Sequence, residues 1–315
     1  PDGNYLVVTT VNVTTASQSF YFDGVVIRAA TMVASDYVFY ATGIDNLSFF
    51  TPKLVTPPTQ TAFVQLGGFI QLSNCNFAKV LNGTFVSRGV GGNPTLISHL
   101  STPGCDDLLI QGNYFAYSYG NACSAQDGIG DGVRGKRVRI VDNVFSENVD
   151  TSVGLFTNCS DVIVANIVYT NNNILIANNI IKNQFIGPSD IGCGIRFTPI
   201  STYDTSIKII NNEIIVTNFT CVGIDLAIAQ TGTAEIEIDR NKIIAGPGAC
   251  LRTQGTGANN PITWIAGNNN FSGTLATTIH EQQSSPANVK EMGAPVMQNT
   301  GVTLTASSPV KLLSG

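Results

Sequence analysis

One short phrase of apolar residues and asparagine recurs along the second half of the chain. It reads apolar, any, apolar, any, any, Asn, any, apolar, and its asparagines are Asn113, Asn143, Asn179, Asn212, Asn241 and Asn269. The intervals between successive asparagines are 30, 36, 33, 29 and 28 residues, a period that is typical of stacked supersecondary units. Because apolar residues two apart are typical of a strand with one buried face, each copy predicts a strand that ends at a corner.

The asparagine of each copy is expected to lie at that corner. Asparagine tolerates the left-handed backbone region and forms local hydrogen bonds, which suits a tight turn. Successive asparagines are therefore predicted to stack along one edge of the molecule. Two earlier copies carry another residue in place of Asn, and they are interpreted as Ile70/Leu72/Cys75/Phe77 and Leu47/Phe49/Pro52/Leu54.

A second strand signal follows each corner, which predicts a second stack of equivalent strands. It occurs at 153–155, 193–197, 222–226 and 250–253. The longest interval, from Asn143 to Asn179, contains the segment 157–173, which is interpreted as an excursion in the form of an antiparallel hairpin. A β-sandwich is the alternative, but its turns recur every 8 to 12 residues without a register of about 30.

Together these repeats resemble the right-handed parallel β-helix proteins of the pectate-lyase-like superfamily, whose coils carry asparagine ladders at one corner. The resemblance spans roughly residues 38 to 275 and includes tailspike-type and virion-surface β-helices. It implies an all-β, right-handed parallel β-helix solenoid with loop excursions and an extended C-terminal tail. The expected parts are an N-terminal cap or first coils at 1–40, the β-helix at 41–275, and a capping or oligomerisation tail at 276–315.

Composition narrows the class of protein. Charged residues make up 12% of the chain, about half the usual share, so the surface owes its polarity to Ser, Thr, Asn and Gly. This composition favours an extracellular or virion location. A net charge of −5 gives no basic footprint for nucleic acid, and no apolar run is long enough to span a membrane.

The cysteines are expected to be small core residues. There are seven, Cys75, Cys105, Cys123, Cys159, Cys193, Cys221 and Cys250, and an odd count argues against a complete disulfide framework. One bridge between neighbouring coils, such as Cys193 to Cys221, is the alternative. His99 and His280 are the only histidines and lie far apart in sequence, so no metal site and no cofactor is expected.

Three acids are the candidate catalytic residues. Glu235, Glu237 and Asp239 alternate along one strand, so their side chains share a face at roughly 6 to 7 Å, near the carboxylate spacing of glycosidases. Lys208, one coil earlier, is a candidate substrate-binding residue that could tune Glu237. The alternative is a solvated acidic stripe opposed by Lys208.

The outward column that contains Glu237 bears on lyase chemistry. It is predicted to consist of Gln71, Leu109, Arg139, Leu175, Lys208, Glu237 and Ile265. The resemblance to pectate-lyase-like enzymes implies calcium-binding acids on such a face. With a single acid in the column, calcium-dependent lyase chemistry is poorly supported.

A second outward column supplies the remaining candidate substrate-binding residues, Phe156, Arg196, Asp225 and Arg252. An Asp between two Arg at the strand spacing of about 4.8 Å predicts a salt-bridge ladder. Arginine forks beside an aromatic ring also suit sugars or carboxylates, so binding stays an alternative.

We interpret the chain as a structural or host-binding β-helix component of a virus or phage particle, which could be directed to a glycan. The alternatives are a secreted polysaccharide hydrolase or lyase and a non-catalytic adhesin. Expected partners are further copies of the chain, with a trimer as one candidate, other virion proteins, and a polysaccharide. The segment from residue 282 is expected to cap the last coil or to mediate self-association.

Overall fold

The computed structural model describes residues 3–29, 32, 36–56, 68–86, 98–102, 104–116, 136–146, 163–165, 172–183, 193–197, 205–216, 222–228, 234–255, 262–266, 268–274, 278–283, 288–292 and 296–297. Within these ranges all regular structure is strand, and every strand pair is parallel. The strands form three long faces, which we call sheets A, B and C.

Each sheet collects every third strand, with one break in sheet B. Sheet A contains β1 (Asn4–Val7), β4 (Val25–Arg28), β7 (Lys53–Val55), β10 (Thr84–Val86), β13 (Tyr114–Ala116), β15 (Val144–Ser146), β18 (Ile180–Asn183), β21 (Glu213–Val216), β24 (Lys242–Ala245), β27 (Asn270–Gly273) and β30 (Val296–Met297). Sheet B has two parts: β2 (Val11–Val13), β5 (Tyr37–Thr42), β8 (Gly68–Ser73) and β11 (Ser98–Ser101), then β16 (Ile163–Ala165), β19 (Cys193–Phe197), β22 (Val222–Ile228), β25 (Ala249–Gly255) and β28 (Thr278–Gln283). Sheet C contains β3 (Ser19–Tyr21), β6 (Ser48–Phe50), β9 (Lys79–Leu81), β12 (Leu109–Gln111), β14 (Val138–Val141), β17 (Asn172–Ala177), β20 (Thr205–Ile210), β23 (Ala234–Asp239), β26 (Ile262–Ala266) and β29 (Asn288–Met292).

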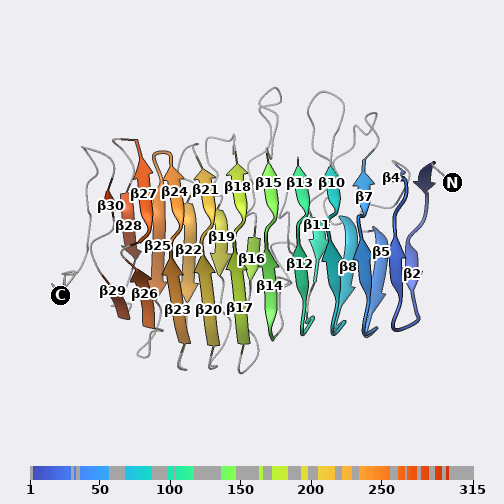
Figure 1. Cartoon of the computed structure of the whole chain (residues 1–315), viewed down its shortest axis with the longest axis horizontal. Coiled ribbons are helices and arrows are strands. Elements are labelled where there is room, and N and C mark those ends of the chain that lie inside the picture. The colour runs from blue at the N-terminus through green and yellow to red at the C-terminus, as the bar shows by residue number, and fades with distance from the viewer. Residues whose placement is uncertain are drawn as a thin grey trace.

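The chain visits sheets A, B and C in turn and climbs one strand per revolution. Figure 1 shows the strands following one another in chain order from one end of an elongated stack to the other. The predicted right-handed parallel β-helix is confirmed. Each coil buries its inward side chains against the coils on either side, so the core is one continuous column.

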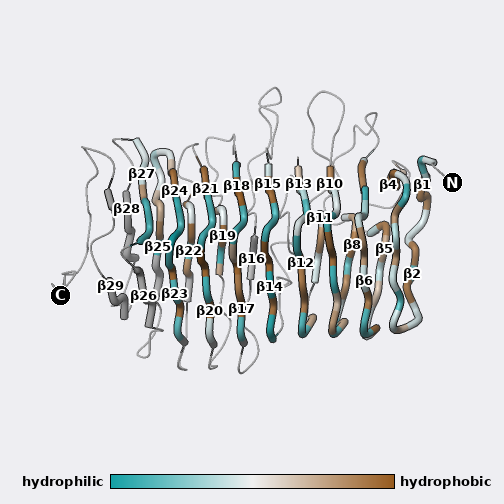
Figure 2. The backbone as a smooth tube through the Cα atoms, in the orientation of Figure 1, coloured by the Kyte–Doolittle hydropathy of each residue, from teal (hydrophilic) through white to brown (hydrophobic). Residues whose placement is uncertain are grey.

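The core is built from repeated positions. On sheet A the rings of Phe85, Phe115 and Phe145 stack with centroid separations of 4.8 and 5.0 Å and interplanar angles of 13° and 7°. Offset stacking of this kind adds roughly 0.5–1.5 kcal/mol per pair beyond the burial of apolar area. Figure 2 shows the cause in the sequence, an alternation of hydrophobic and hydrophilic residues along the strands.

The predicted asparagine ladder is confirmed at the corner between sheets C and A. All six asparagines are buried. Asn143 is representative: its Oδ1 accepts hydrogen bonds from the backbone N–H of Asn113 at 2.9 Å and from Asn113 Nδ2 at 3.0 Å. Its Nδ2 donates to the carbonyl of Ile110 at 3.0 Å. The ladder therefore satisfies backbone groups that the turn takes out of sheet pairing.

The reason for asparagine at this corner differs from the one that the sequence suggests. The left-handed backbone belongs to the residue before the first five ladder positions, as in Asp142 (φ 57°), Asn178 (φ 57°) and Asn211 (φ 54°). These residues form a second, exposed ladder, in which Asn211 Nδ2 donates to Asn178 Oδ1 at 2.8 Å. The buried asparagines are required for their amide groups rather than for backbone freedom.

Of the two earlier copies, one is confirmed and the other is wrong. Leu54 aligns with Phe85 in sheet A, so the copy at 47–54 is confirmed. Ile70 instead lies in β8 of sheet B, opposite Phe39. The missed copy is the next segment along the chain, where Gly83 occupies the asparagine position and its N–H donates to Asn113 Oδ1 at 2.7 Å.

The antiparallel hairpin predicted for 157–173 is also wrong. Ile163–Ala165 is strand β16, which pairs in parallel with β19. Residues 172–173 open β17, which pairs in parallel with β20. Residues 153–155, predicted as the sheet B strand of this region, lie outside the described ranges.

Strand pairing continues past the predicted start of the tail. Strands β28, β29 and β30 pair with β25, β26 and β27. At the other end β1 pairs with β4, so coil pairing already includes residue 4. The division into cap, coil and tail remains a prediction, but residue 276 is not where the strand pairing ends.

Candidate functional site

The predicted catalytic acids lie on β23 of sheet C. Alternation with buried Ile236 and Ile238 places Glu235, Glu237 and Asp239 on the opposite face of the sheet, as expected. The side chain of Glu237 is 41% exposed, and its Oε2 lies 2.8 Å from Nζ of Lys208. Lys208 and Glu237 are aligned in neighbouring strands, so the predicted pairing is confirmed.

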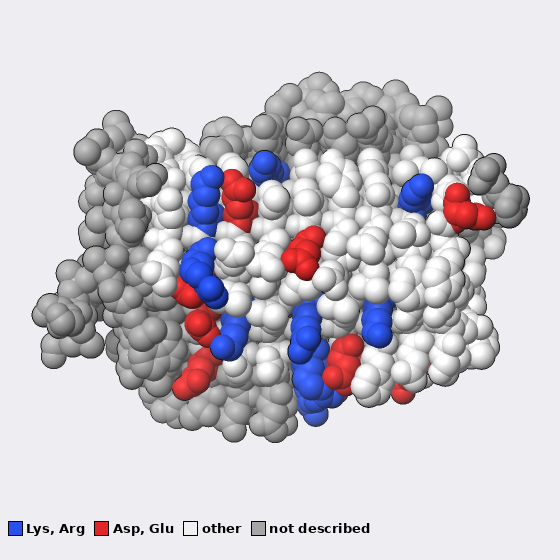
Figure 3. All heavy atoms as spheres, in the orientation of Figure 1, with Lys and Arg blue, Asp and Glu red and all other residues white. Residues whose placement is uncertain are grey.

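The third acid has partners of its own. Asp239 Oδ2 lies 3.0 Å from Nε of Arg240, and its Oδ1 accepts a hydrogen bond from Asn268 Nδ2 at 3.3 Å. Figure 3 shows that charged side chains on this view of the molecule are sparse and that several acids lie beside basic side chains. This geometry is that of an acidic stripe opposed by cations.

The outward column around Glu237 differs from the predicted one at both ends. Gln71 lies in β8 of sheet B, and Lys79 of β9 takes its place. At the other end Glu237 aligns with Trp264, not with Ile265. The cause is one additional residue between strand and corner in the last copy, which a fixed spacing cannot detect.

The second predicted column forms a ladder on sheet B. Arg196, Asp225 and Arg252 align in consecutive strands. Asp225 Oδ2 lies 3.4 Å from Arg196 Nε and 4.0 Å from Arg252 Nη1, and the Asp225 side chain is 2% exposed. Cys193 Sγ also donates to the same oxygen at 3.7 Å. These contacts confirm the salt-bridge ladder.

Phe156, the remaining member of that column, lies outside the described residues. The strand register places Val164 of β16 opposite Arg196. The aromatic neighbour predicted for the arginine ladder is therefore not the residue at that register position. The error follows from taking residues 153–155 as the strand.

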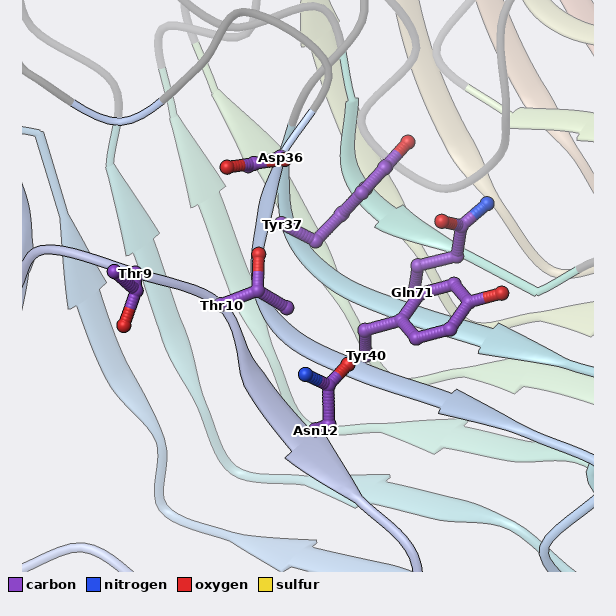
Figure 4. Close-up of a pocket in the computed structure, with 7 residues that line it drawn as sticks. All are labelled: Thr9, Thr10, Asn12, Asp36, Tyr37, Tyr40 and Gln71. Carbon is purple, nitrogen blue, oxygen red and sulfur yellow. The ribbon is translucent and has the colours of Figure 1, made fainter.

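A cavity on the first part of sheet B was not predicted from the sequence. Its volume is about 490 Å³, and it is lined by Thr9, Thr10, Asn12, Asp36, Tyr37, Tyr40 and Gln71. Figure 4 shows Tyr40 beside Gln71, with Asn12 on the other side of Tyr40. These three residues come from β2, β5 and β8 and align across the sheet. A parallel sheet thus sets an amide, a phenol and an amide in a row at about 4.8 Å intervals.

One lining segment, that of Asp36 and Tyr37, is held by a buried arginine. Arg28 is fully buried, and its Nη2 donates to the backbone carbonyl of Asp36 at 3.2 Å. Burial lowers the pKa of Arg28, and the charge of Asp36 opposes that shift. Because arginine remains protonated at neutral pH even so, Arg28 anchors the segment that brings Asp36 and Tyr37 to the cavity.

The sequence offered only a weak signal for this cavity. Alternation in 37–42 predicts Tyr40 on the outer face, since Phe39 and Ala41 are buried. Its neighbours come from coils without the asparagine marker, and Gln71 was predicted to lie in sheet C. The alignment of Asn12, Tyr40 and Gln71 could therefore not be predicted without knowing how the strands pair.

Comparison with known proteins bears on the fold. No protein-family model and no curated protein matches the sequence. The Dettilon tailspike protein (gp208) has a similar structure, with a TM-score of 0.52 and 12% identity over 94% of this chain and 61% of the tailspike chain. This likeness shows the fold alone. The chain thus spans less than two thirds of the tailspike.

A hyperthermoactive exopolygalacturonase from Thermotoga maritima is also similar, with a TM-score of 0.47 and 12% identity over 93% of this chain and 83% of that chain. Within the described residues no three His, Cys, Asp or Glu side chains gather in a group that could hold a metal ion. No helix there is long and apolar enough to cross a membrane.

Proposed function

We propose that the protein is a structural β-helix of a virus or phage particle that binds a glycan through the cavity on sheet B. The observation that carries this proposal is the row of Asn12, Tyr40 and Gln71, which borders a cavity of about 490 Å³. The tailspike-like fold supports the particle assignment. The proposal concerns a neutral or weakly charged glycan, because the lining holds one carboxyl group, that of Asp36, and no Lys, Arg or His.

The lining has the chemistry that sugar recognition needs. A tyrosine presents an apolar ring face to the C–H groups of a pyranose and a hydroxyl at its edge. Amide side chains donate and accept, so Asn12 and Gln71 match vicinal hydroxyls. Asp36 adds a charged acceptor, and hydrogen bonds to charged groups are the stronger ones. Specificity would follow from the fixed spacing of these groups along the sheet.

The competing function is polysaccharide cleavage by Glu235, Glu237 and Asp239. One observation favours it, the presence of three acids on one face of β23. The contact between Glu237 and Lys208, and that between Asp239 and Arg240, instead support a charge-paired surface. We therefore propose that β23 does not cleave the glycan, which binds at the cavity on sheet B.

The test is a glycan array followed by calorimetry on each hit, with the wild-type protein and Tyr40→Ala. Loss of the ring is expected to weaken binding by about tenfold, since 1.4 kcal/mol corresponds to that factor. Tyr21→Ala is the matched control, because Tyr21 is 75% exposed and stacks on Phe50 of sheet C. Equal affinity of wild type and Tyr40→Ala would overturn the site.

The enzyme alternative is decided in the same experiment. Each bound glycan is incubated with wild-type protein and with Glu237→Gln, and new reducing ends are measured. If the wild-type protein cleaves a glycan and Glu237→Gln does not, the function is catalysis at β23 and the binding proposal is wrong. Binding without cleavage supports the proposal.

A further inference from the structure

Two cysteines occupy equivalent places at the corner between sheets B and C. Cys75 lies four residues after Gln71 and Cys105 lies four after Ser101, and these two strand residues are paired. Each cysteine also lies four residues before one member of the pair Lys79 and Leu109. The two corners have the same length, so the cysteines stack directly on one another.

The contacts agree with this register. The backbone N–H of Cys75 donates to Sγ of Cys105 at 3.4 Å. Cys105 Sγ donates to the carbonyl of Leu72 at 3.2 Å, and Cys75 Sγ donates to the carbonyl of Ser73 at 3.4 Å. Stacked residues of neighbouring parallel strands are about 4.8 Å apart, within the Cα separation of 4.4–6.8 Å that disulfides require.

The pair is chemically asymmetric. The neighbouring Cys105 thiol lowers the pKa of Cys75 to about 7, whereas Cys75 and burial raise the pKa of Cys105. The thiolate is the reactive form in exchange with disulfides. At neutral pH Cys75 is therefore the nucleophile of the pair and Cys105 the resolving thiol.

A short turn separates the pair from solvent. Both cysteines are fully buried, but Asn74 is exposed and Phe77 is 52% exposed. Asn74 and Phe77 have φ values of 52° and 57°. A bulky residue such as Phe77 is strained in this backbone region, so opening of the turn relieves that strain.

We propose that Cys75 and Cys105 form an oxidisable pair, closed as a disulfide between adjacent coils by a low-molecular-weight disulfide such as oxidised glutathione. The Cys75 thiolate attacks one sulfur of the oxidant, the S–S bond of the oxidant breaks, and one glutathione thiolate leaves. Cys105, after losing its proton, then attacks Cys75 Sγ in the mixed disulfide and releases the second glutathione thiolate. Two protein thiols are oxidised, the oxidant is reduced to two thiols, and the two protons pass to the leaving thiolates.

The other described cysteines differ and provide controls. Cys193 lies beside Asp225 and Cys250 Sγ lies 3.4 Å from the carbonyl of Ser272. Burial raises the pKa of Cys250 to about 12, so its thiol is a poor nucleophile at neutral pH. Cys221, the other end of the alternative bridge from Cys193, lies outside the described residues.

The test is incubation of the full chain with oxidised glutathione at pH 8, quenching with an alkylating agent, and peptide mapping without reduction. The expected product is one cross-linked peptide pair that joins Cys75 to Cys105, with both thiols lost from the alkylated pool. The closed loop of 30 residues is expected to raise the apparent Tm by about 5 °C, reversibly with dithiothreitol.

The variants separate this pair from general thiol oxidation. Cys250→Ser is expected to give the same cross-link and the same Tm shift as wild type. Cys75→Ser is expected to leave Cys105 alkylatable and to abolish the shift. Two outcomes overturn the proposal: Cys75 and Cys105 both remain alkylatable in the wild type, or either is found linked to a different cysteine. Because the wild-type map alone decides between these, poor folding of Cys75→Ser does not weaken the test.

Discussion

Asn143 and Asn179 stack so closely that one amide oxygen serves two donors of its neighbour. Oδ1 of Asn179 accepts hydrogen bonds from the backbone N–H and from Nδ2 of Asn143, both at 3.0 Å. The interval between the two residues is 36, the longest in the ladder, so the inserted segment does not disturb the corner. The corner is thus kept while the connection elsewhere in the coil varies in length.

Replacing Asn179 by Leu is therefore expected to destabilise the protein by about 1–3 kcal/mol, because buried backbone groups of the neighbouring coil lose their partner. The measurement is the urea unfolding midpoint. Asn211→Gly is the control, since Asn211 is exposed with a φ of 54°, and glycine adopts that conformation readily. Equal losses in the two variants would mean that the buried amide has no special role.

Gly83 marks the end of the ladder, and we expect Gly83→Ala to disrupt it. A Cβ at this position would lie 2.6 Å from Pro52 Cγ, 2.7 Å from the Phe85 ring and 2.9 Å from Asn113 Oδ1. Overpacking of this kind costs about 1–3 kcal/mol, which a thermal melt can detect.

The control for this substitution is Gly43→Asn. Gly43 has a φ of 64°, and a Cβ at its position would meet no atom within 4 Å. Asparagine tolerates that backbone region. A melt in which Gly83→Ala resembles Gly43→Asn and the wild type would show that the corner can expand.

The asparagine phrase was sufficient to predict the fold, because both of its parts have one physical meaning. Alternating apolar residues must face the core of a solenoid, and a buried amide at a fixed place must serve the backbone of its neighbours. The phrase led to a wrong assignment where a residue other than asparagine occupies the corner position. Gly83 leaves room for the amide of Asn113 instead of supplying one, and its copy was therefore assigned to β8.

The candidate sites were predictable only in part. Contacts between side chains of neighbouring coils depend on which strand residues are aligned. The pairs Lys208 with Glu237 and Arg196 with Asp225 follow from equal spacing between coils. One additional residue before Asn269 shifted Trp264 into the column instead of Ile265. The row of Asn12, Tyr40 and Gln71 joins coils that carry no asparagine marker, so the sequence pattern could not align them.

Two charge pairs are expected to differ greatly in their contribution to stability. Asp225 is buried between two partly buried arginines, so Asp225→Asn removes the carboxylate that both contact and is expected to cost about 3–5 kcal/mol. Glu237→Gln removes an exposed pair and is expected to cost less than about 1 kcal/mol. Urea unfolding of both variants measures this difference, and similar losses would contradict the assignment of the buried ladder as structural.

The contact between Asp107 and Arg137 predicts a small dependence of stability on pH. Arg137 Nη2 donates to Asp107 Oδ2 at 2.6 Å, and this hydrogen bond lowers the pKa of Asp107 below its ordinary value of 3.8. A carboxyl whose pKa is depressed by folding stabilises the folded state above its unfolded pKa, and that contribution is lost as pH falls through the folded pKa. The loss is therefore expected below about pH 4, and it is small because Arg137 is exposed.

The corresponding measurement is an NMR titration of the Asp107 carboxyl in wild type and in Arg137→Gln. Removal of the guanidinium is expected to raise the pKa of Asp107 toward 3.8. Lys242→Gln is the matched control, because it removes an exposed cation that pairs with Glu213 on a different coil. A pKa of Asp107 that stays unchanged in Arg137→Gln, or that moves equally in Lys242→Gln, would show that the contact with Arg137 does not hold this carboxylate in its charged form.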